Sequence, residues 1–253
     1  MVNFLTKQLN VFVLPAQAEF VPFSYVEEAK DETPVRQMIA DNCRWSEMPK
    51  EMRPERPHKK IKAAMGIDLS VDDDLSAVSL VWRKSGALHA YVLYFLPENT
   101  IHNHKNRALY EEWVEQGYLI PCGQDIIDAA VIFQAIVDAA RLFDIQVIRY
   151  DSYKAADLIN LLVAKGMKER CKPLSQTAGN YNKVVEAMKM ALMQTPQQMM
   201  FVPNPITDWC FQNVQIVVSG TQENKMPCKL APDSPRKIDG VMATLMAMYD
   251  YFN

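Results

Sequence analysis

Three aspartates in the sequence lie where a carboxylate is unusual unless it does chemistry. Asp68 follows the apolar run AAMGI, Asp151 follows VIRY, and Asp239 opens the apolar segment DGVMATLMAMY. Burying an unpaired carboxylate is costly, so an acid in such a place usually has a partner or binds a metal. For Asp239 alone, the ordinary explanation is the favourable interaction of an acid with a helix N-terminus.

Taken together, the three acids indicate a shared site for two divalent metal ions. Two Mg²⁺ or Mn²⁺ ions roughly 4 Å apart need several carboxylates from different elements, and these hard cations prefer oxygen ligands. Such a pair cleaves phosphodiesters by activating water, without a side-chain nucleophile. In the run VDDD, Asp74 is a candidate extra ligand, whereas Asp72 and Asp73 fit a solvated acidic turn.

Basic residues form two groups that phosphates would attract. Three candidate DNA-binding cations come shortly before Asp239: Lys225, Lys229 and Lys237. If Asp239 lies in the site, these lysines border it; otherwise they are ordinary surface charge. The proline- and charge-rich stretch 49–62 fits a solvated tether and a phosphate-contacting arm equally well.

The elements that position the acids follow an α/β pattern. Runs rich in β-formers predict strands over 63–70, 75–82 and 88–96, and their short spacers favour an antiparallel meander. Helices and short strands then alternate: helices 105–116, 129–143, 155–164, 181–193 and 237–251, strands 147–151 and 199–202, and a hairpin at 215–230. Helical crossovers make the later strands parallel to the first, which predicts a mixed central sheet with helices on both faces.

Composition and missing motifs exclude several classes of protein. The 253 residues are long enough for a core without staples, and five scattered cysteines with no CxxC pair argue against a disulfide framework or zinc knuckle. A net charge of −3 argues against a strongly basic, non-specific nucleic-acid binder. No apolar run reaches about 18 residues, so we expect no membrane span. Walker A, dinucleotide and nucleophile-elbow motifs are missing, and His102 and His104 lack a third ligand for zinc.

The first 60 residues differ from the rest of the chain. They are rich in proline and show no clean strand alternation, and Pro34 is expected to interrupt any helix over 27–43. We therefore expect a connector or linker over 1–60 and an α/β domain over 61–253.

Several segments resemble the nuclease domain of tailed-bacteriophage terminase large subunits, which are DNA-packaging enzymes. The main matches are GIDLSVDDDLSAV at 66–78, RYDSYKAADLINLLVAKG at 149–166 and KIDGVMATLMA at 237–247. Weaker matches are LSQTAGNYN at 174–182 and NPITDWCFQN at 204–213. The opening FLTKQLNVFV at 4–13 looks like the connector that follows the family's packaging ATPase domain.

This resemblance implies a ribonuclease H-like fold and a Mg²⁺- or Mn²⁺-dependent endonuclease that cuts double-stranded concatemeric viral DNA. By motif, the family's metal-binding aspartates fall on Asp68, Asp151 and Asp239. It also implies that the hairpin at 215–230 contacts or gates DNA. In the full-length protein, an ATPase motor domain, a portal and a small terminase subunit would be partners, in the host cytoplasm. Because this chain has no Walker motif, we expect no ATPase activity from it.

Three alternatives stay open. A ribonuclease H-like resolvase or transposase would share the fold and act on another DNA substrate. GIDLS also resembles the start of an actin-like ATPase phosphate loop, although VDDD stands where that loop needs glycine and threonine. A non-catalytic binding module on the same fold would leave the three acids without metal.

Overall fold

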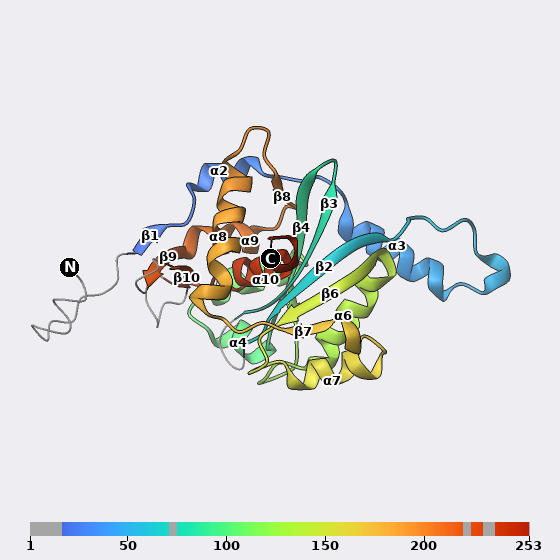
Figure 1. Cartoon of the computed structure of the whole chain (residues 1–253). Coiled ribbons are helices and arrows are strands. Elements are labelled where there is room, and N and C mark those ends of the chain that lie inside the picture. Colours follow the sequence, from blue (N-terminus) through green and yellow to red (C-terminus); the bar gives the residue numbers. More distant parts are fainter. Residues whose placement is uncertain (1–16, 71–74, 220–223, 230–235, 253) are drawn as a thin grey trace, which may run out of the picture.

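The computed structural model describes residues 17–70, 75–219, 224–229 and 236–252. Its main feature is a seven-stranded sheet in the order β5-β4-β3-β2-β6-β7, with β8 paired to β4 (Figure 1). The strands are β2 Ile61–Asp68, β3 Ser76–Lys84, β4 Ala87–Leu96, β5 Leu119–Pro121, β6 Phe143–Tyr150, β7 Cys171–Pro173 and β8 Met199–Phe201. The candidate ligand Asp74 and its neighbours Asp72 and Asp73 lie outside the described residues.

The directions of the strands confirm the predicted mixed sheet. β2, β3 and β4 are antiparallel neighbours, and β6 lies parallel to β2. β5 and β8 run parallel to β4, and β7 runs parallel to β6. Within this sheet β3 therefore runs against the other strands, as expected for a meander followed by helical crossovers.

Helices cover both faces of the sheet and create two cores (Figure 1). The first core contains α8 Ala178–Met193, α9 Pro205–Asn213 and α10 Asp239–Phe252. The second contains α3 Val35–Glu47, α6 Ala129–Leu142 and α7 Ala156–Ala164. Shorter helices complete the described chain: α2 Phe23–Glu28, α4 Glu98–Asn103, α5 Arg107–Glu115, and the 3₁₀ turns η1 Lys50–Met52 and η2 Lys168–Arg170. None of the described helices is both long and apolar enough to cross a bilayer.

Strand alternation decides which face receives Asp68. Met65 and Ile67 of β2 belong to the second core, with α6. Because successive side chains of a strand point to opposite faces, Gly66 and Asp68 point toward the first core, where α10 crosses β2.

Gly66 allows α10 to pack directly on β2. A Cβ atom at this position would lie 1.9 Å from the carbonyl oxygen of Ala243 and 2.5 Å from the amide nitrogen of Ala247. Any larger residue would therefore push the helix off the strand. This close approach brings the first residue of α10, Asp239, to the end of the sheet where Asp68 lies.

A second, three-stranded antiparallel sheet packs beside the first core. It consists of β1 Gln17–Glu19, β9 Val214–Ser219 and β10 Asn224–Lys229, in the order β1-β9-β10. The antiparallel pairing of β9 with β10 agrees with the hairpin predicted over 215–230. Helix α8 packs against β10, so the small sheet is held beside the central one.

Residues before 60 take part in this packing. Phe20 and Val26 lie in the first core and Val35 in the second. Pro34 precedes α3 as its N-cap, so it marks a helix start where the sequence suggested an interruption. The predicted boundary at residue 60 therefore does not coincide with a break in packing.

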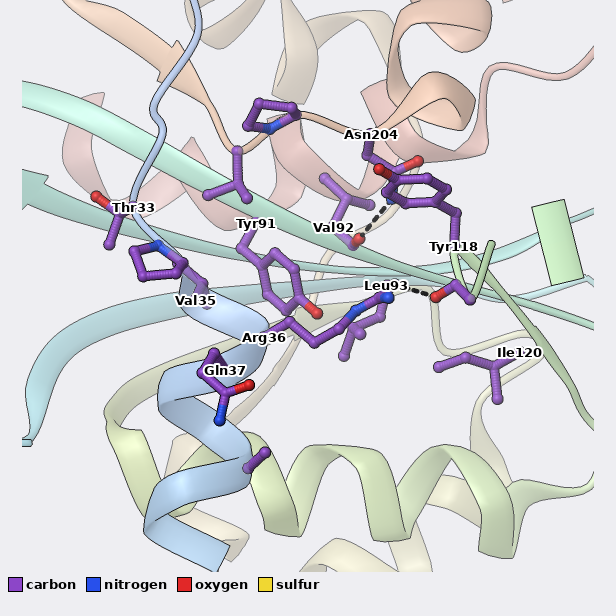
Figure 2. A pocket seen from close by; sticks show the side chains of 15 residues that line it. Thr33, Val35, Arg36, Gln37, Tyr91, Val92, Leu93, Tyr118, Ile120 and Asn204 are labelled. Carbon is purple, nitrogen blue, oxygen red and sulfur yellow. Dashed lines mark hydrogen bonds between the residues drawn. The ribbon is translucent and has the colours of Figure 1, made fainter. Parts of the chain in front are cut away.

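A hollow of about 570 Å³ lies at the edge of β4 (Figure 2). β8 pairs with Leu88–Ala90 and β5 with Tyr94–Leu96, which leaves the β4 edge between them partly open. There Asn204 donates a hydrogen bond to the Val92 carbonyl oxygen, and the Arg36 guanidinium lies over the Tyr118 ring. The residues that line this hollow include no carboxylate, so it is separate from the acids that could do chemistry.

Candidate functional site

The three predicted acids meet at one cavity of about 210 Å³. Asp68 is the last residue of β2, Asp151 directly follows β6, and Asp239 is the first residue of α10. Because β2 and β6 are parallel neighbours, their carboxyl ends lie at the same edge of the sheet. The geometry thus unites acids that are far apart in the sequence.

Other elements close the cavity around the acids. Ser70 lies just beyond β2, Ile238 and Met242 flank the start of α10, and β10 contributes Pro227 and Lys229. The small sheet therefore forms one wall of the site. This wall is the segment that the sequence analysis proposed to contact or gate DNA.

Asp68 is held in an environment that disfavours its charged form. Burial and the neighbouring charge of Asp239 raise the pKa of Asp68 to about 8, although a hydrogen bond from Gln176 and the charge of Lys154 oppose this rise. The Gln176 amide Nε2 donates to Asp68 Oδ1 over 3.0 Å. Two carboxylates that repel each other in a low-dielectric cavity provide a place where a cation would be stabilised.

Asp151 and Asp239 are fixed by their local structure. Asp151 Oδ1 accepts a hydrogen bond from the backbone N–H of Tyr153 over 3.1 Å, which is an Asx turn after the strand. Asp239 is only 8% exposed and lies in the first turn of α10, where the helix dipole favours an acid. Both acids are thus placed by backbone elements and not by long, mobile side chains.

The chemistry of the donors fits a hard divalent cation. Carboxylate oxygens from three elements and the amide group of Gln176 surround the cavity, and Mg²⁺ and Mn²⁺ select oxygen ligands. Among the described residues, however, no three His, Cys, Asp or Glu side chains are already grouped closely enough to enclose an ion. The acids therefore match a metal by ligand type and by the cavity that they share.

Three further residues lie at or near the acids and were not predicted from the sequence to belong to the site. Lys154 lines the cavity three positions after Asp151, and Gln176 lies in the LSQTAGNYN segment. Tyr181 of α8 is 1% exposed, and its hydroxyl is buried without a hydrogen-bond partner among the described residues. Burial, together with the charges of Asp68 and Asp151, raises the pKa of Tyr181 above its usual range. Lys154 is only three residues from Asp151 in the sequence, so it could have been predicted as a site residue. Tyr181 could not, because it lies on a helix whose other buried residues are apolar.

The predicted lysines occupy three different environments. Lys229 lines the acid cavity. Lys225 lies near the other end of β10, and its Nζ is 2.7 Å from Glu186 Oε1 on α8. Lys237 is 4% exposed. The structure thus brings one of the three candidate DNA-binding lysines to the acids, and DNA binding by all three stays a prediction.

Comparison with known proteins identifies the family. A family model described as terminase large subunit, endonuclease domain, matches residues 33–252. The chain belongs to this family. Its members are endonuclease domains of phage DNA-packaging proteins, which agrees with the resemblance found in the sequence. No curated protein sequence matches the chain.

Solved structures support the fold of this terminase nuclease domain. The HK97 bacteriophage large terminase is similar over 99% of this chain and 48% of its own length, with a TM-score of 0.74 and 18% identity. The large terminase nuclease from thermophilic phage G20c is similar over 78% of this chain and 86% of its own, with a TM-score of 0.51 and 10% identity. The chain spans about half the length of the HK97 protein. At these identities the comparisons establish the fold, which is ribonuclease H-like, as predicted.

Proposed function

We propose that this domain is a metal-dependent endonuclease that cuts double-stranded, concatemeric viral DNA during genome packaging by two-metal-ion hydrolysis. The family supplies the reaction class, an endonuclease. The observation that carries the proposal is the convergence of three carboxylates from β2, β6 and α10 on one cavity. A cavity built in this way suits phosphodiester hydrolysis without a covalent intermediate.

Asp68, Asp151 and Asp239 would hold the divalent ions, Mg²⁺ or Mn²⁺. Bound there, the ions would supply Lewis-acid activation of the phosphodiester and of water. A cation bound beside Asp68 would stabilise its charged form, because burial and the charge of Asp239 raise the pKa of Asp68 to about 8 without metal. An ion would therefore displace a proton from this carboxyl group at neutral pH.

Neighbouring residues would orient the acids and the substrate. Gln176 restrains the Asp68 carboxylate through its 3.0 Å hydrogen bond and acts as a positioning residue. Lys154 and Lys229 line the cavity and would attract a phosphate group of DNA. Their positive charge offsets part of the repulsion among the acids and the incoming phosphate.

The wider setting is also proposed. Since the chain spans about half of the HK97 large terminase, the full-length protein would add an ATPase motor domain. Portal and small terminase subunit would be partners of that protein, in the host cytoplasm. Residues up to 60 would serve as the connector to the motor, with 17–47 packed on the nuclease cores.

The test is plasmid cleavage with Mn²⁺, with Mg²⁺ and with chelator. We expect cleavage only with metal, and at least about a 100-fold loss in Asp68→Asn, since removal of one stabilising group costs this much in comparable sites. Asp125→Asn is the matched control, because Asp125 is an exposed acid between β5 and α6 and lies outside the cavity. Undiminished cleavage in chelator, or by Asp68→Asn, would contradict the proposal. Preference for branched over linear DNA would favour the resolvase alternative.

A further inference from the structure

A second hollow, of about 380 Å³, concentrates positive charge on the opposite side of the domain from the acids. It lies between α3, α6 and the segments that precede β2 and follow α7. Its lining includes five cationic residues: Arg56, Lys60, Arg141, Lys165 and Arg170. The residues that line it include no carboxylate. We call this feature the basic hollow.

Neutral carbonyl groups hold several of these cations in place. Arg56 Nη2 donates to the Arg141 carbonyl oxygen over 2.6 Å, and Lys60 Nζ donates to the Ala140 carbonyl oxygen over 2.7 Å. The Arg56 guanidinium also lies over the Trp45 ring, 5.5 Å from its centre. These contacts fix the positions of the charges without neutralising them, which prepares the hollow for an anion.

Carboxylates pair with two of the five cations of the basic hollow, whereas Arg56, Lys60 and Lys165 form no ion pair with another described residue. Among the described ion pairs of its five cations, Asp138 lies 3.5 Å from Arg141 and Asp144 lies 3.9 Å from Arg170. These two carboxylates lower the local positive potential but leave an excess of positive charge, because the other three cations are not paired with a described acid. Burial and the nearby charges of Arg56 and Arg170 lower the pKa of Lys60, although the charge of Asp144 opposes this.

The basic hollow and the acid cavity lie at opposite ends of the same strands. Asp68 ends β2, whereas Lys60 directly precedes it, and a strand of this length spans about 23 Å. Helix α7 lies between the two sites in the sequence, because it begins five residues after Asp151 and ends next to Lys165. The exposed residues of α7 include one acid, Asp157, so little repels a polyanion along this helix.

From this arrangement we infer that the basic hollow is a second DNA-backbone site, which binds phosphates of the same duplex that is cut at the acid cavity. The inference rests on the proposed function. A span of about 23 Å corresponds to about 7 base pairs at 3.4 Å per step. The hollow would therefore fix the duplex several base pairs from the cleaved bond and set its direction across α7. The stretch 49–62, which carries Arg56 and Lys60, would be the phosphate-contacting arm that the sequence left as one of two interpretations.

Duplex binding by the full chain in chelator, without metal, tests this inference. The variant is Lys165→Gln with Arg170→Gln, since both residues are exposed and lie at the rim of the hollow. Its control is Lys105→Gln with Arg107→Gln, which removes the same charge from an exposed segment outside the hollow. Affinity is measured at several salt concentrations for a duplex of about 30 base pairs and one of about 6, which is too short to span both sites.

For the long duplex we expect the hollow variant to bind about 10-fold more weakly and to lose one to two units, roughly 0.9 per phosphate contact, from the salt slope. The short duplex should be affected less, and the control variant should resemble wild type. Equal affinity and slope in the hollow variant and wild type would overturn the inference and favour an acidic protein segment as the occupant.

Metal-dependent plasmid cleavage at saturating DNA is measured in parallel. If wild type does not cleave, the proposed function fails; if it cleaves but the hollow variant binds like wild type, only this inference fails.

Discussion

The two ends of the parallel pair β2 and β6 differ in charge and in burial. At the carboxyl end, the carboxylates of Asp68 and Asp239 lie in a cavity lined by α10 and the small sheet. Their mutual repulsion disfavours the charged form of Asp68 and raises its pKa. At the amino end, arginine and lysine side chains surround an open hollow and bond to neutral carbonyl groups. The same pair of strands therefore carries a buried acidic site at one end and an exposed basic site at the other.

We therefore expect the acidic end to carry out DNA cleavage and the basic end to contribute DNA binding. Buried charges interact strongly because little solvent screens them, so a small change at the acid cavity should have a large effect. Exposed cations are screened by salt, so the basic hollow should contribute affinity that falls steeply with ionic strength. At the acidic end, four features should set the size of these effects: the packing of α10 on β2, the titration of Asp68, Lys229 of β10 and the buried Tyr181 hydroxyl.

The largest loss caused by a substitution is expected where α10 touches β2. Gly66→Ala would place a Cβ 1.9 Å from a backbone oxygen of α10, so the helix must move and carry Asp239 away from Asp68. We expect a loss of about 3 kcal/mol in the free energy of unfolding and a severe loss of cleavage. Chemical denaturation and plasmid cleavage measure the two effects.

Gly179→Ala is the matched control for this change. Gly179 lies near the start of α8, with open space where its Cβ would be. The same substitution should therefore be neutral or stabilise the protein by up to about 1 kcal/mol through helix propensity. Equal stability of Gly66→Ala and wild type would mean that α10 does not need this close approach.

The acidic end was largely predictable because its signals are local. Asp68 and Asp151 each close an apolar run, and runs of β-formers revealed the strands that carry them. Tertiary packing decided what the sequence did not reveal. Lys225 and Lys229 belong to one strand, yet four residues of strand span about 13 Å, so one reaches the acids and the other pairs with Glu186.

The basic end was only partly predictable because its cations come from separate segments. The stretch 49–62 showed a dense local charge, but Arg141 lies in the last turn of α6 and Arg170 ends η2, both far along the chain. Only the packing of α3 against α6 and of α6 against α7 brings these segments together. Likewise, β1 and α2 were not predicted, since three-residue strands and short helices near prolines carry weak periodicity.

Stability of the metal-free protein should depend on pH through Asp68. Its pKa is about 8 in the folded protein and lower when unfolded, so the folded state binds the extra proton between about pH 4 and pH 8. Stability must therefore fall as pH rises through this window. We expect wild type to lose roughly 4 kcal/mol between pH 5 and pH 8 in chelator.

Asp68→Asn removes this titration and serves as the reference. Its stability should change less over the same pH range, and it should exceed that of wild type at pH 8 without metal. Urea denaturation at several pH values measures both. Parallel curves for wild type and variant would show that Asp68 does not titrate in this window. Lower stability of the variant at pH 8 would make Asp68 a structural group.

A smaller effect is expected from the lysines of β10. Lys229→Ala removes a cation that lines the acid cavity, so DNA affinity should fall several-fold and the salt slope should decrease by about one unit. Lys225→Ala should change affinity less, because this lysine pairs with Glu186 at 2.7 Å. Duplex binding in chelator compares the two. Equal losses in both variants would mean that the whole hairpin contacts DNA.

The smallest effect concerns the Tyr181 hydroxyl, which is buried without a hydrogen-bond partner among the described residues. Such a group costs stability, so Tyr181→Phe should be neutral or stabilise the protein by up to about 1 kcal/mol. Because burial and the charges of Asp68 and Asp151 raise its pKa, the hydroxyl stays protonated and keeps a proton that it can donate to a carboxylate. If it positions an acid during cleavage, the variant should cleave a few-fold more slowly and need more Mn²⁺ for half-maximal activity, while being no less stable. A loss of stability with unchanged cleavage would instead show that the hydroxyl has a structural partner, and that the acid cavity does not use it.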